Sequence, residues 1–353
     1  MKVLLTGAAG FIGSHIRAAL DEAGHEVVGL DALIEQAHGS YAAAPQDVQT
    51  GDVRDGALLD ALLDDVDAVC HQAAMVGNGV DAQDLPTYAS HNDLGTTELL
   101  AAMARRGVDR LVLASSMVVY GDGRYTCDSD GSVAPAPRRA DDLTRGRFDP
   151  RCPVCSGPLS WERIDESVSP HPRTSYAASK VAQENYADAW CTLQAGRCIA
   201  LRYHNVYGPG MPADTPYSGV AAIFRSALER GEAPRVFEDG AQTRDFVHVA
   251  DVARANVAAL ERLHTHDVGV SAYNVCSGHP FTIGEMARAL AEAAGGTTPV
   301  VTGEYRTFDV RHVVASPERA RTGLEFEALV RPEDGIAELA SAPLRLRREA
   351  DAP

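Results

Sequence analysis

The feature that most constrains this fold is the glycine-rich stretch TGAAGFIG near the N-terminus. Gly7, Gly10 and Gly13 follow a short apolar run, KVLL, and precede SHIRAALDEAG, in which apolar residues recur with helical spacing. Glycines at such a turn let backbone amides approach a diphosphate that sits on the N-terminus of the helix. The sequence therefore predicts a dinucleotide-binding turn, which also includes Phe11 and Ile12.

An acidic residue follows the glycine turn at the distance expected of a dinucleotide-binding site. Asp31 ends the second predicted strand, EVVGLD. A carboxylate about twenty residues after the glycines accepts the ribose hydroxyls and repels an additional 2′-phosphate, so we expect NAD rather than NADP. A solvated turn residue is the alternative for Asp31. Asp52 and Val53, in GDVRD after the third strand, are expected at the adenine edge, although without the glycine turn they would be an ordinary loop.

The first part of the chain alternates buried strands with helices. After the glycine turn, AVCHQAA and RLVLASS resemble strands, and ALLDALLDD and GTTELLAAMARRG have helical spacing. This order predicts an α/β, Rossmann-like, doubly wound parallel sheet with a smaller C-terminal substrate-binding lobe. We expect the dinucleotide domain at 1–204, the second lobe at 205–341 and a flexible tail at 342–353. Part of 245–275 is expected to pack back on the first domain.

Charge and composition exclude several classes of protein. The 353 residues carry a formal charge of −17, and nucleic-acid binding requires a basic surface, so we expect no nucleic-acid partner. No apolar run reaches the length of a membrane span, and the N-terminus has no secretory signal, so we expect a cytoplasmic protein without a membrane partner. The odd number of cysteines, seven, does not suggest a disulfide framework.

A tyrosine and a lysine indicate the chemistry. Tyr176 and Lys180, in YAASK, are four residues apart in a helical pattern, so both lie on one face. A lysine ammonium beside the phenol would lower its pKa and let it act as a general base. Ser116, in SSMVVYGD, could hydrogen-bond the same substrate oxygen. A tyrosine and a lysine at this spacing, taken alone, would be better interpreted as part of an ordinary surface helix. The presence of the glycine turn and Asp31 makes the catalytic interpretation the better one.

These motifs together carry a resemblance to a known family. TGAAGFIGSH, HQAA at 71–74, NDLGT at 92–96, SSMVVYGD, YAASK, RYHNVYGPG and RDFVHVADVA extend over nearly the whole chain. The chain resembles the extended short-chain dehydrogenases/reductases of the NAD-dependent sugar epimerase/dehydratase family. The resemblance implies a catalytic set of Ser116, Tyr176 and Lys180, and an NAD environment that includes Ala73, Ala74, Asn92, Tyr203 and His204. Most relatives have an aromatic residue where this chain has His204.

The residues after the serine narrow the reaction. Relatives that dehydrate or decarboxylate sugars commonly carry acids there, whereas this chain has Met117 and Val118. The resemblance therefore implies a nucleotide-sugar 4-epimerase, an isomerase in which Tyr176 takes the proton of the sugar 4-hydroxyl, NAD takes the C4 hydride, and the 4-keto sugar turns and is reduced on its other face. A 4-keto-sugar reductase and a non-catalytic NAD-binding sensor or scaffold are the alternatives.

Other motifs match the part of the family that binds the nucleotide-diphosphate sugar. Arg244 and Asn205 match residues that contact the diphosphate, and Arg306 and Arg311 fall in the segment that closes over the nucleotide. A surface ion pair is the alternative for each arginine. The remaining candidates for substrate contacts are Met75, Gly219, Val220 and Phe237. We also expect a homodimer, with helix 93–106 and the helix of Tyr176 as candidate interfaces.

An insert at 121–174 separates the serine from the tyrosine. Its Cys127, Cys152 and Cys155 could bind a structural zinc ion, with CPVCSG resembling half of a zinc ribbon. The fourth ligand would be His171, a carboxylate or another chain, and free thiols in a loop are the alternative. With PYSGVAAIF and FEDGAQTRDFVHV, the insert resembles members that epimerise dTDP-L-rhamnose. UDP-glucose, UDP-galactose and UDP-glucuronate remain alternative substrates.

Overall fold

A seven-stranded parallel sheet organises the larger part of the chain. The computed structural model describes residues 1–38, 44–77, 82–213 and 219–345. The strand order is β13-β9-β5-β4-β1-β2-β3, and every neighbouring pair is parallel. The predicted Rossmann-like fold is confirmed. The strands are β1 (Lys2–Thr6), β2 (Glu26–Asp31), β3 (Val48–Thr50), β4 (Ala68–His71), β5 (Arg110–Ser116), β9 (Arg197–Tyr203) and β13 (Gly269–Val275).

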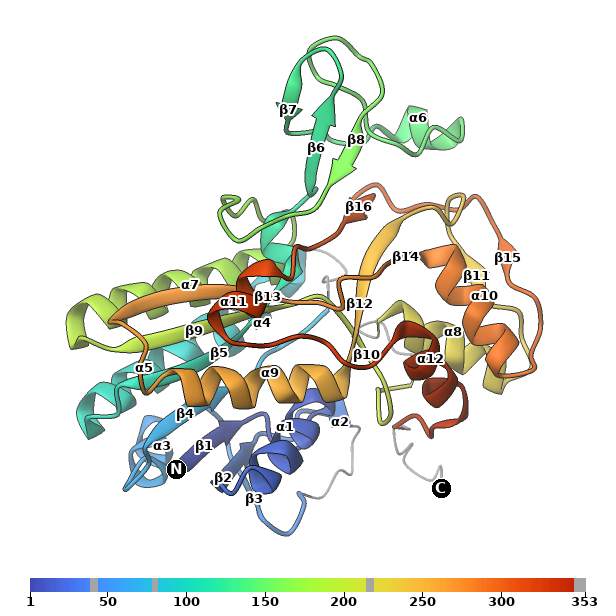
Figure 1. Cartoon of the computed structure of the whole chain (residues 1–353). Helices are drawn as coiled ribbons and strands as arrows, with labels where there is room; N and C mark the ends of the chain where they lie inside the picture. Colours follow the sequence, from blue (N-terminus) through green and yellow to red (C-terminus); the bar gives the residue numbers. More distant parts are fainter. Residues whose placement is uncertain (39–43, 78–81, 214–218, 346–353) are drawn as a thin grey trace.

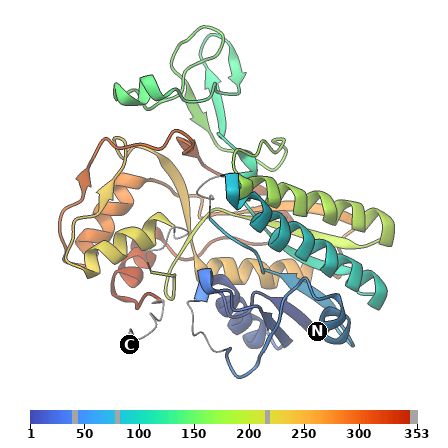
Figure 2. The ribbon, with the colours of Figure 1, turned by 180° about the vertical axis from the view of Figure 1, so that it is seen from behind.

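Helices cover both faces of this sheet because its strands are apolar on both sides (Figures 1 and 2). Side chains alternate along β1, so that Val3 and Leu5 belong to one core and Leu4 to the other. The first core includes α1 (Phe11–Glu22) and α9 (Val249–Arg262), and the second includes α3 (Gly56–Leu62), α5 (Gly95–Arg106) and α7 (Ser175–Gln194). Shorter helical pieces are α2 (Glu35–His38), η1 (Ala82–Asp84), α4 (Leu85–Tyr88), η2 (Ala89–Leu94) and η3 (Met117–Tyr120).

Part of the C-terminal half returns to the large sheet. Strand β13 pairs with β9 along its whole length, and α9 packs against α1. The 245–275 segment therefore contributes a helix and an edge strand to the dinucleotide domain. Helix α11 (Glu318–Gly323) contacts β13.

The smaller lobe has its own core beside the carboxyl ends of the large sheet (Figure 1). Its helices are α8 (Val220–Glu229), α10 (Ile283–Ala293) and α12 (Pro332–Ser341), and its strands are β10 (Asn205–Tyr207), β11 (Arg235–Val236), β12 (Thr243–His248), β14 (Pro280–Thr282), β15 (Val300–Val301) and β16 (His312–Val313). A capping box between Thr282 and Glu285 begins α10. Of the expected tail, Leu344 is buried in this core, and residues 346–353 lie outside the described part.

The insert forms a small module that projects from the body (Figures 1 and 2). It contains β6 (Arg124–Cys127), β7 (Gly131–Val133), α6 (Ala140–Thr144) and β8 (Ser160–Glu162), and the strands pair in the antiparallel order β7-β6-β8. The sequence pattern showed no periodicity here because each strand is only three or four residues long. The chain rejoins the body where Ile164 bridges Ala315.

Two further observations concern helices and thiols. Within the described ranges, no helix is long and apolar enough to cross a bilayer. All seven cysteines have free thiols, and Cys155 is the exposed member.

Candidate functional site

The glycine turn is packed too tightly for any side chain. Gly7 has φ +70°, and a Cβ there would lie 2.8 Å from the backbone nitrogen of Ala73. A Cβ on Gly13 would lie 1.9 Å from the carbonyl oxygen of Gly7. Gly10 precedes the first residue of α1 and offers no side-chain cap, so the first backbone N–H groups of this helix are left for another acceptor. This cradle fits the diphosphate of a dinucleotide.

A groove of about 1100 Å³ runs from this turn along the carboxyl ends of the large sheet. We call it the glycine-loop groove. It is lined by most of the residues predicted to bind cofactor, and by the predicted catalytic set: Gly7, Gly10, Phe11, Ile12, Gly13, Asp31, Asp52, Val53, Ala73, Ala74, Tyr203 and His204, with Ser116, Tyr176 and Lys180.

Asp31 lies on the wall of the groove with one acceptor position to spare. Its oxygens accept hydrogen bonds from the backbone N–H groups of Ala9 (2.9 Å) and Leu33 (2.8 Å), and His38 Nε2 is 3.3 Å away. Burial raises the pKa of Asp31, but hydrogen bonds from His38, Leu33 and Ala9 outweigh it and leave that pKa below its usual value. A carboxylate has about four acceptor positions, so one remains for a ribose hydroxyl.

Arg345 reaches the same groove from the far end of the chain. Its backbone pairs with the 211–213 strand segment, and its Nη1 donates to the carbonyl oxygen of Ala9 at 2.8 Å. It lines the groove beside the glycine turn. Sequence reasoning missed it because it lies in the segment assigned to the tail, where the basic run LRLRR was the available signal.

Ser116, Tyr176 and Lys180 meet where β5 ends and α7 begins. Thr174 caps α7 with its side chain, which places Tyr176 in the first turn of the helix. The Ser116 side chain lies beside the Tyr176 hydroxyl and lowers its pKa as a hydrogen-bond partner. One turn further on, Lys180 Nζ lies 5.9 Å from the centroid of the Tyr176 ring and donates to the carbonyl oxygen of Ala114 at 2.8 Å. The three side chains therefore form one cluster on the groove wall.

The electrostatics of this cluster differ from the expected lowering of the tyrosine pKa. Burial raises the pKa of Tyr176 to about 12, and the hydrogen bond with Ser116 only partly opposes this. Burial also lowers the pKa of Lys180 to about 7. The lysine directs its Nζ to the Ala114 carbonyl oxygen and is not among the groups that shift the tyrosine. A phenol with this pKa is protonated at neutral pH and can act as a hydrogen-bond donor.

The structure places Asn92 and Met75, which are predicted to contact ligands, behind the wall of the groove. Among the described residues, these two line neither this groove nor the second cavity described below. Asn92 accepts a hydrogen bond from the Met75 N–H (2.7 Å) and donates to the Met75 carbonyl oxygen (3.0 Å) and to Ser179 Oγ (2.8 Å). Because Ser179 is on α7, Asn92 ties the loop after β4 to the helix that carries Tyr176. Its place in the fold is that of a positioning residue.

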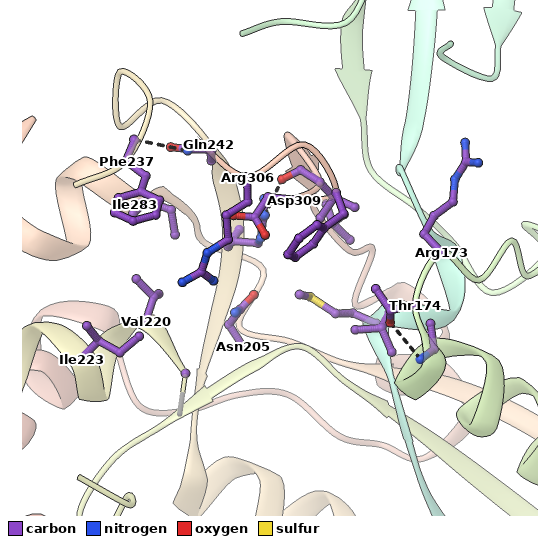
Figure 3. Close-up of a pocket in the computed structure, with 18 of the residues that line it drawn as sticks. Arg173, Thr174, Asn205, Val220, Ile223, Phe237, Gln242, Ile283, Arg306 and Asp309 are labelled. Carbon is purple, nitrogen blue, oxygen red and sulfur yellow. Dashed lines mark hydrogen bonds between the residues drawn. The ribbon is translucent and has the colours of Figure 1, made fainter. Parts of the chain in front are cut away.

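A second cavity, of about 470 Å³, adjoins the groove (Figure 3). We call it the arginine cavity because Arg173, Arg235, Arg244 and Arg306 line it. Arg306 extends toward Asn205 across the space. Both cavities share the lining residues Met117, Asn205, Gly219, Ile223, Arg306 and Phe308, and the predicted residues Val220, Phe237 and Arg244 line the arginine cavity alone.

The arginine cavity has polar groups that the described residues leave available. Arg244 is buried and donates to the carbonyl oxygens of Thr243, Val310 and Arg311, and no described carboxylate forms an ion pair with it. Burial lowers its pKa to about 10, so it stays charged at neutral pH. Asn205 Oδ1 is buried without a hydrogen-bond partner among the described residues. A cationic guanidinium and a free amide suit an anionic, hydroxyl-rich ligand.

Arg311 does not line this cavity, contrary to the predicted contact with the nucleotide. It is buried and pairs with Glu238 (2.9 Å), Asp239 (2.7 Å) and Asp149 (2.7 Å). Glu238 is itself buried, so the guanidinium is fully engaged by acids from the lobe and from the insert. Arg311 therefore stabilises the wall of the arginine cavity through ion pairs on the side that faces away from the cavity.

The three insert cysteines come together at the tip of the module. Cys127, Cys152 and Cys155 form a group with Asp130, and none of the four lines either cavity. His171, one candidate for a fourth ligand, is not in the group. The sequence contained a signal for Asp130, because Cys127-x-x-Asp130 repeats the spacing of Cys152-x-x-Cys155 with an acid in place of the second cysteine.

Comparisons with known proteins agree with this geometry. The family model described as NAD dependent epimerase/dehydratase family matches residues 3–140 and 156–276. The chain is 34% identical to dTDP-L-rhamnose 4-epimerase of Burkholderia thailandensis, over 96% of this chain and 93% of that protein. It is 31% identical to UDP-glucose 4-epimerase of Mycolicibacterium smegmatis, over 96% of both. The crystal structure of Thermus thermophilus UDP-glucose 4-epimerase in complex with NAD superimposes with a TM-score of 0.74, at 31% identity, over 96% of this chain and 98% of that one.

Proposed function

This chain belongs to the NAD dependent epimerase/dehydratase family, and from that membership and the geometry of the site we propose that it is an isomerase: it inverts C4 of a nucleotide-diphosphate sugar with NAD as cofactor. The observation that carries the proposal is the position of the Tyr176 hydroxyl. It lies beside Ser116 on the wall of the glycine-loop groove, where that groove joins the arginine cavity through Met117 and Asn205. A sugar held there faces both the phenol and the cofactor groove.

The residues of the chain have separate tasks in this reaction. Bound NAD supplies the acceptor and the donor of one hydride. Tyr176 takes the proton of the sugar 4-hydroxyl and returns it after the sugar has turned over. Ser116 holds that oxygen and the phenol in one hydrogen-bonded line. Lys180, whose pKa of about 7 keeps part of it as an ammonium at neutral pH, would have to leave the Ala114 carbonyl oxygen in order to favour the phenolate during the reaction.

The substrate is held by the arginine cavity. Arg244 and Arg306 neutralise the diphosphate, which an acidic protein must do locally. Asn205 adds an amide next to the reacting sugar, and Gly219, at the start of α8, offers backbone N–H groups. Phe237 lies under Arg306, with 5.4 Å from guanidinium to ring centroid, and forms a platform for the base.

The residues after Ser116 favour epimerisation over elimination of water. Met117 lines both cavities, where an acid would be needed to protonate a leaving hydroxyl. The carboxylate that the described residues contribute to the lining of the arginine cavity is Asp309, which comes from the segment before β16 and not from the residues after Ser116. Re-reduction of a 4-keto sugar is therefore favoured over loss of a hydroxyl.

We take dTDP-L-rhamnose as the best substrate, because the B. thailandensis relative named for it matches almost the whole chain. UDP-glucose, UDP-galactose and UDP-glucuronate are the competing substrates, supported by the UDP-glucose 4-epimerases among the relatives.

A substrate panel with isotope tracing tests the proposal. We expect each accepted sugar nucleotide to give its C4 epimer without added NADH, and deuterium placed at C4 of the substrate to remain at C4 of the product. Product that forms only with stoichiometric NADH would indicate a reductase. Tight NAD binding without turnover of any dTDP- or UDP-sugar would indicate a sensor or scaffold.

Assembly and location complete the proposal. We place the protein in the cytoplasm, where its free thiols stay reduced, and fractionation of cells that express a tagged chain checks this. We assign a homodimer to the neighbouring helices α5 and α7, beside which Leu94, Tyr186 and Leu193 are exposed. Light scattering of the protein should give the mass of two chains, and Leu94→Asp with Leu193→Asp should give the mass of one.

A further inference from the structure

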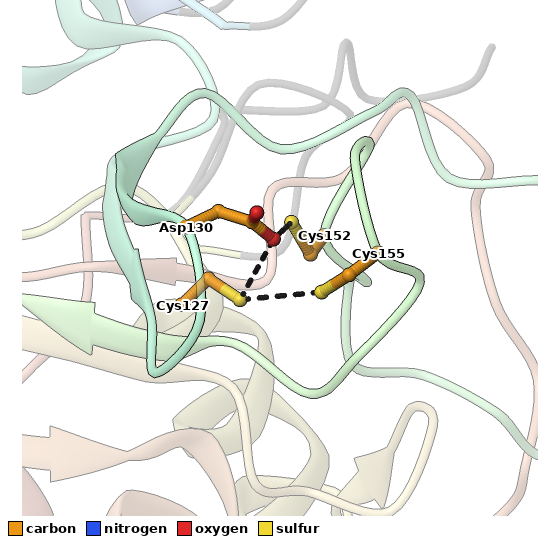
Figure 4. A group of neighbouring side chains, drawn as sticks. All are labelled: Cys127, Asp130, Cys152 and Cys155. Atoms are coloured by element: carbon orange, nitrogen blue, oxygen red, sulfur yellow. Dashed lines mark hydrogen bonds between the residues drawn. The ribbon is translucent and has the colours of Figure 1, made fainter.

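Four potential metal ligands converge at the tip of the insert, from two separate loops (Figure 4). Cys127 ends β6, Asp130 precedes β7, and Cys152 and Cys155 belong to the loop before β8. Cys127 Sγ lies 3.5 Å from Cys155 Sγ and 3.4 Å from Asp130 Oδ2, and Cys152 Sγ lies 3.1 Å from the same oxygen. All four ligand atoms lie within 4.8 Å of one another.

These distances have the size of a tetrahedral zinc site. Zinc binds thiolate sulfur at ~2.3 Å, which places neighbouring ligands of a tetrahedron about 3.8 Å apart. The separation of Cys127 and Cys155 is close to that value and well above the ~2.0 Å of a disulfide bond. Three thiolates and one carboxylate are soft enough to prefer zinc over calcium or magnesium, which take oxygen ligands.

The loop of Cys152 and Cys155 is shaped to stabilise thiolate. The backbone N–H of Val154 donates to Cys152 Sγ at 3.4 Å, and the N–H of Ser156 closes the turn on the Cys152 carbonyl oxygen at 2.9 Å. Arg151 Nη1 donates to the carbonyl oxygen of Ser156 at 3.0 Å and so supports the same turn. An amide donor to the sulfur favours the deprotonated ligand.

The module has little apolar core of its own. Tyr125, Leu143 and Phe148 are buried, but the apolar core clusters of the described residues include none of residues 121–163, and the strands of the module have three or four residues each. A segment of about 40 residues with so small a core normally needs a metal or a disulfide to fold. We infer that Cys127, Asp130, Cys152 and Cys155 bind one structural zinc ion that holds the insert together.

The zinc-bound tip supports the wall of the arginine cavity from outside. Arg138 pairs with Glu238 at 2.6 Å and donates to the carbonyl oxygen of Arg306 at 3.2 Å. Asp149 pairs with Arg311. The 304–313 segment therefore has the insert on one side and the cavity on the other. Loss of zinc should loosen this wall and weaken substrate binding, a consequence that rests on the proposed function.

Metal analysis of the full chain, purified without chelator, tests the site itself. We expect about one zinc per chain. Asp130→Ala should lower the affinity for the probe Co²⁺ by at least about tenfold. The control Asp128→Ala, an exposed acid two residues away, should leave it unchanged. Asp130→Cys should retain the metal and strengthen the sulfur-to-cobalt absorption, because it completes a four-cysteine site.

Several outcomes would overturn the inference. These are reduced protein that binds neither zinc nor cobalt, equal effects of Asp128→Ala and Asp130→Ala, and a disulfide among the three cysteines found by alkylation and mass spectrometry. Zinc removal should raise KM for the sugar nucleotide more than the Kd of NAD. Zinc present in a chain without epimerase activity would contradict the proposed function alone, and an active epimerase that holds no zinc when purified without chelator and binds none when zinc is added would contradict this inference alone.

Discussion

The glycine-loop groove and the arginine cavity adjoin each other but are built in different ways. The groove follows the carboxyl ends of parallel strands, so most of the predicted cofactor residues that line it lie at the end of a strand or just after it, and the sequence identifies these strands. The cavity is assembled from Thr174, Asn205, Arg244 and the 304–313 segment, which meet only through long-range contacts. The comparison teaches that a motif predicts the location of a residue well when the helix or strand that carries the residue fixes its position. The prediction is poor when a segment far away in the sequence fixes that position.

The largest effect should come from the point where the two regions meet. Tyr176→Phe removes the proton acceptor and keeps the ring, so we expect kcat to fall about 10³-fold, with NAD binding unchanged. Steady-state kinetics and NAD titration measure the two quantities. Tyr186→Phe, an exposed tyrosine on the same helix, is the matched control and should keep full turnover. Full activity of Tyr176→Phe would remove the proposed mechanism.

The next effect distinguishes two arginines of the cavity wall. Arg311→Met leaves the buried Glu238 without one of its cationic partners, and we expect a loss of about 3 kcal/mol in the free energy of unfolding. Arg244→Lys keeps a charge but loses the planar fork, so its main effect should be a rise in KM of about tenfold. Denaturant unfolding and kinetics of both variants check this. A purely kinetic effect of Arg311→Met would place that residue in contact with substrate.

A smaller, pH-dependent effect is expected in the groove. The folded pKa of Lys180, about 7, is below its unfolded value, so the unfolded chain binds more protons between these pKa values and stability rises with pH there. Below pH 7 Lys180 is protonated in both the folded and the unfolded chain. The free energy of unfolding is then lowered by the full cost of burying the lysine charge. Lys180→Met should therefore stabilise the cofactor-free protein by about 2 kcal/mol below pH 7, allowing for the lost bond to Ala114, and this gain should vanish by about pH 10.

Thermal unfolding across this pH range measures the difference. Lys2→Met, a partly exposed lysine on the first strand, should show no such slope. An equal gain at every pH would mean that the charge of Lys180 is not the cause.

The smallest effect concerns Arg345, which is an exception to the difference between the two regions. It lies in the glycine-loop groove but comes from a segment distant in the sequence. Arg345→Ala removes a guanidinium beside the glycine turn, and we expect the Kd of NAD to rise about fivefold. Titration of the cofactor-free protein measures it, with the exposed Arg331→Ala as control. An unchanged Kd would show that Arg345 only closes the 211–213 segment.

The sequence by itself determined the parallel sheet, the glycine turn, and the presence of Asp31, Ser116, Tyr176 and Lys180 in one groove. These depend on local spacing, because strand period, helix period and turn geometry are set by neighbouring residues. The same reasoning located Cys152 and Cys155, whose spacing is local, and overlooked Asp130, which shares a loop with Cys127 but has its other two partners on a separate loop.

Only the tertiary structure decided which charged groups face a ligand and which face one another. Arg244 and Arg311 belong to similar arginine-containing motifs, but acids of the lobe and the insert surround Arg311 alone. Arg345 meets Ala9 across 336 residues of chain. Such pairings depend on how separate elements pack, and charge interactions depend on distance in space rather than in sequence. For that reason the residues of the glycine-loop groove could be predicted from their motifs, whereas the wall of the arginine cavity could not.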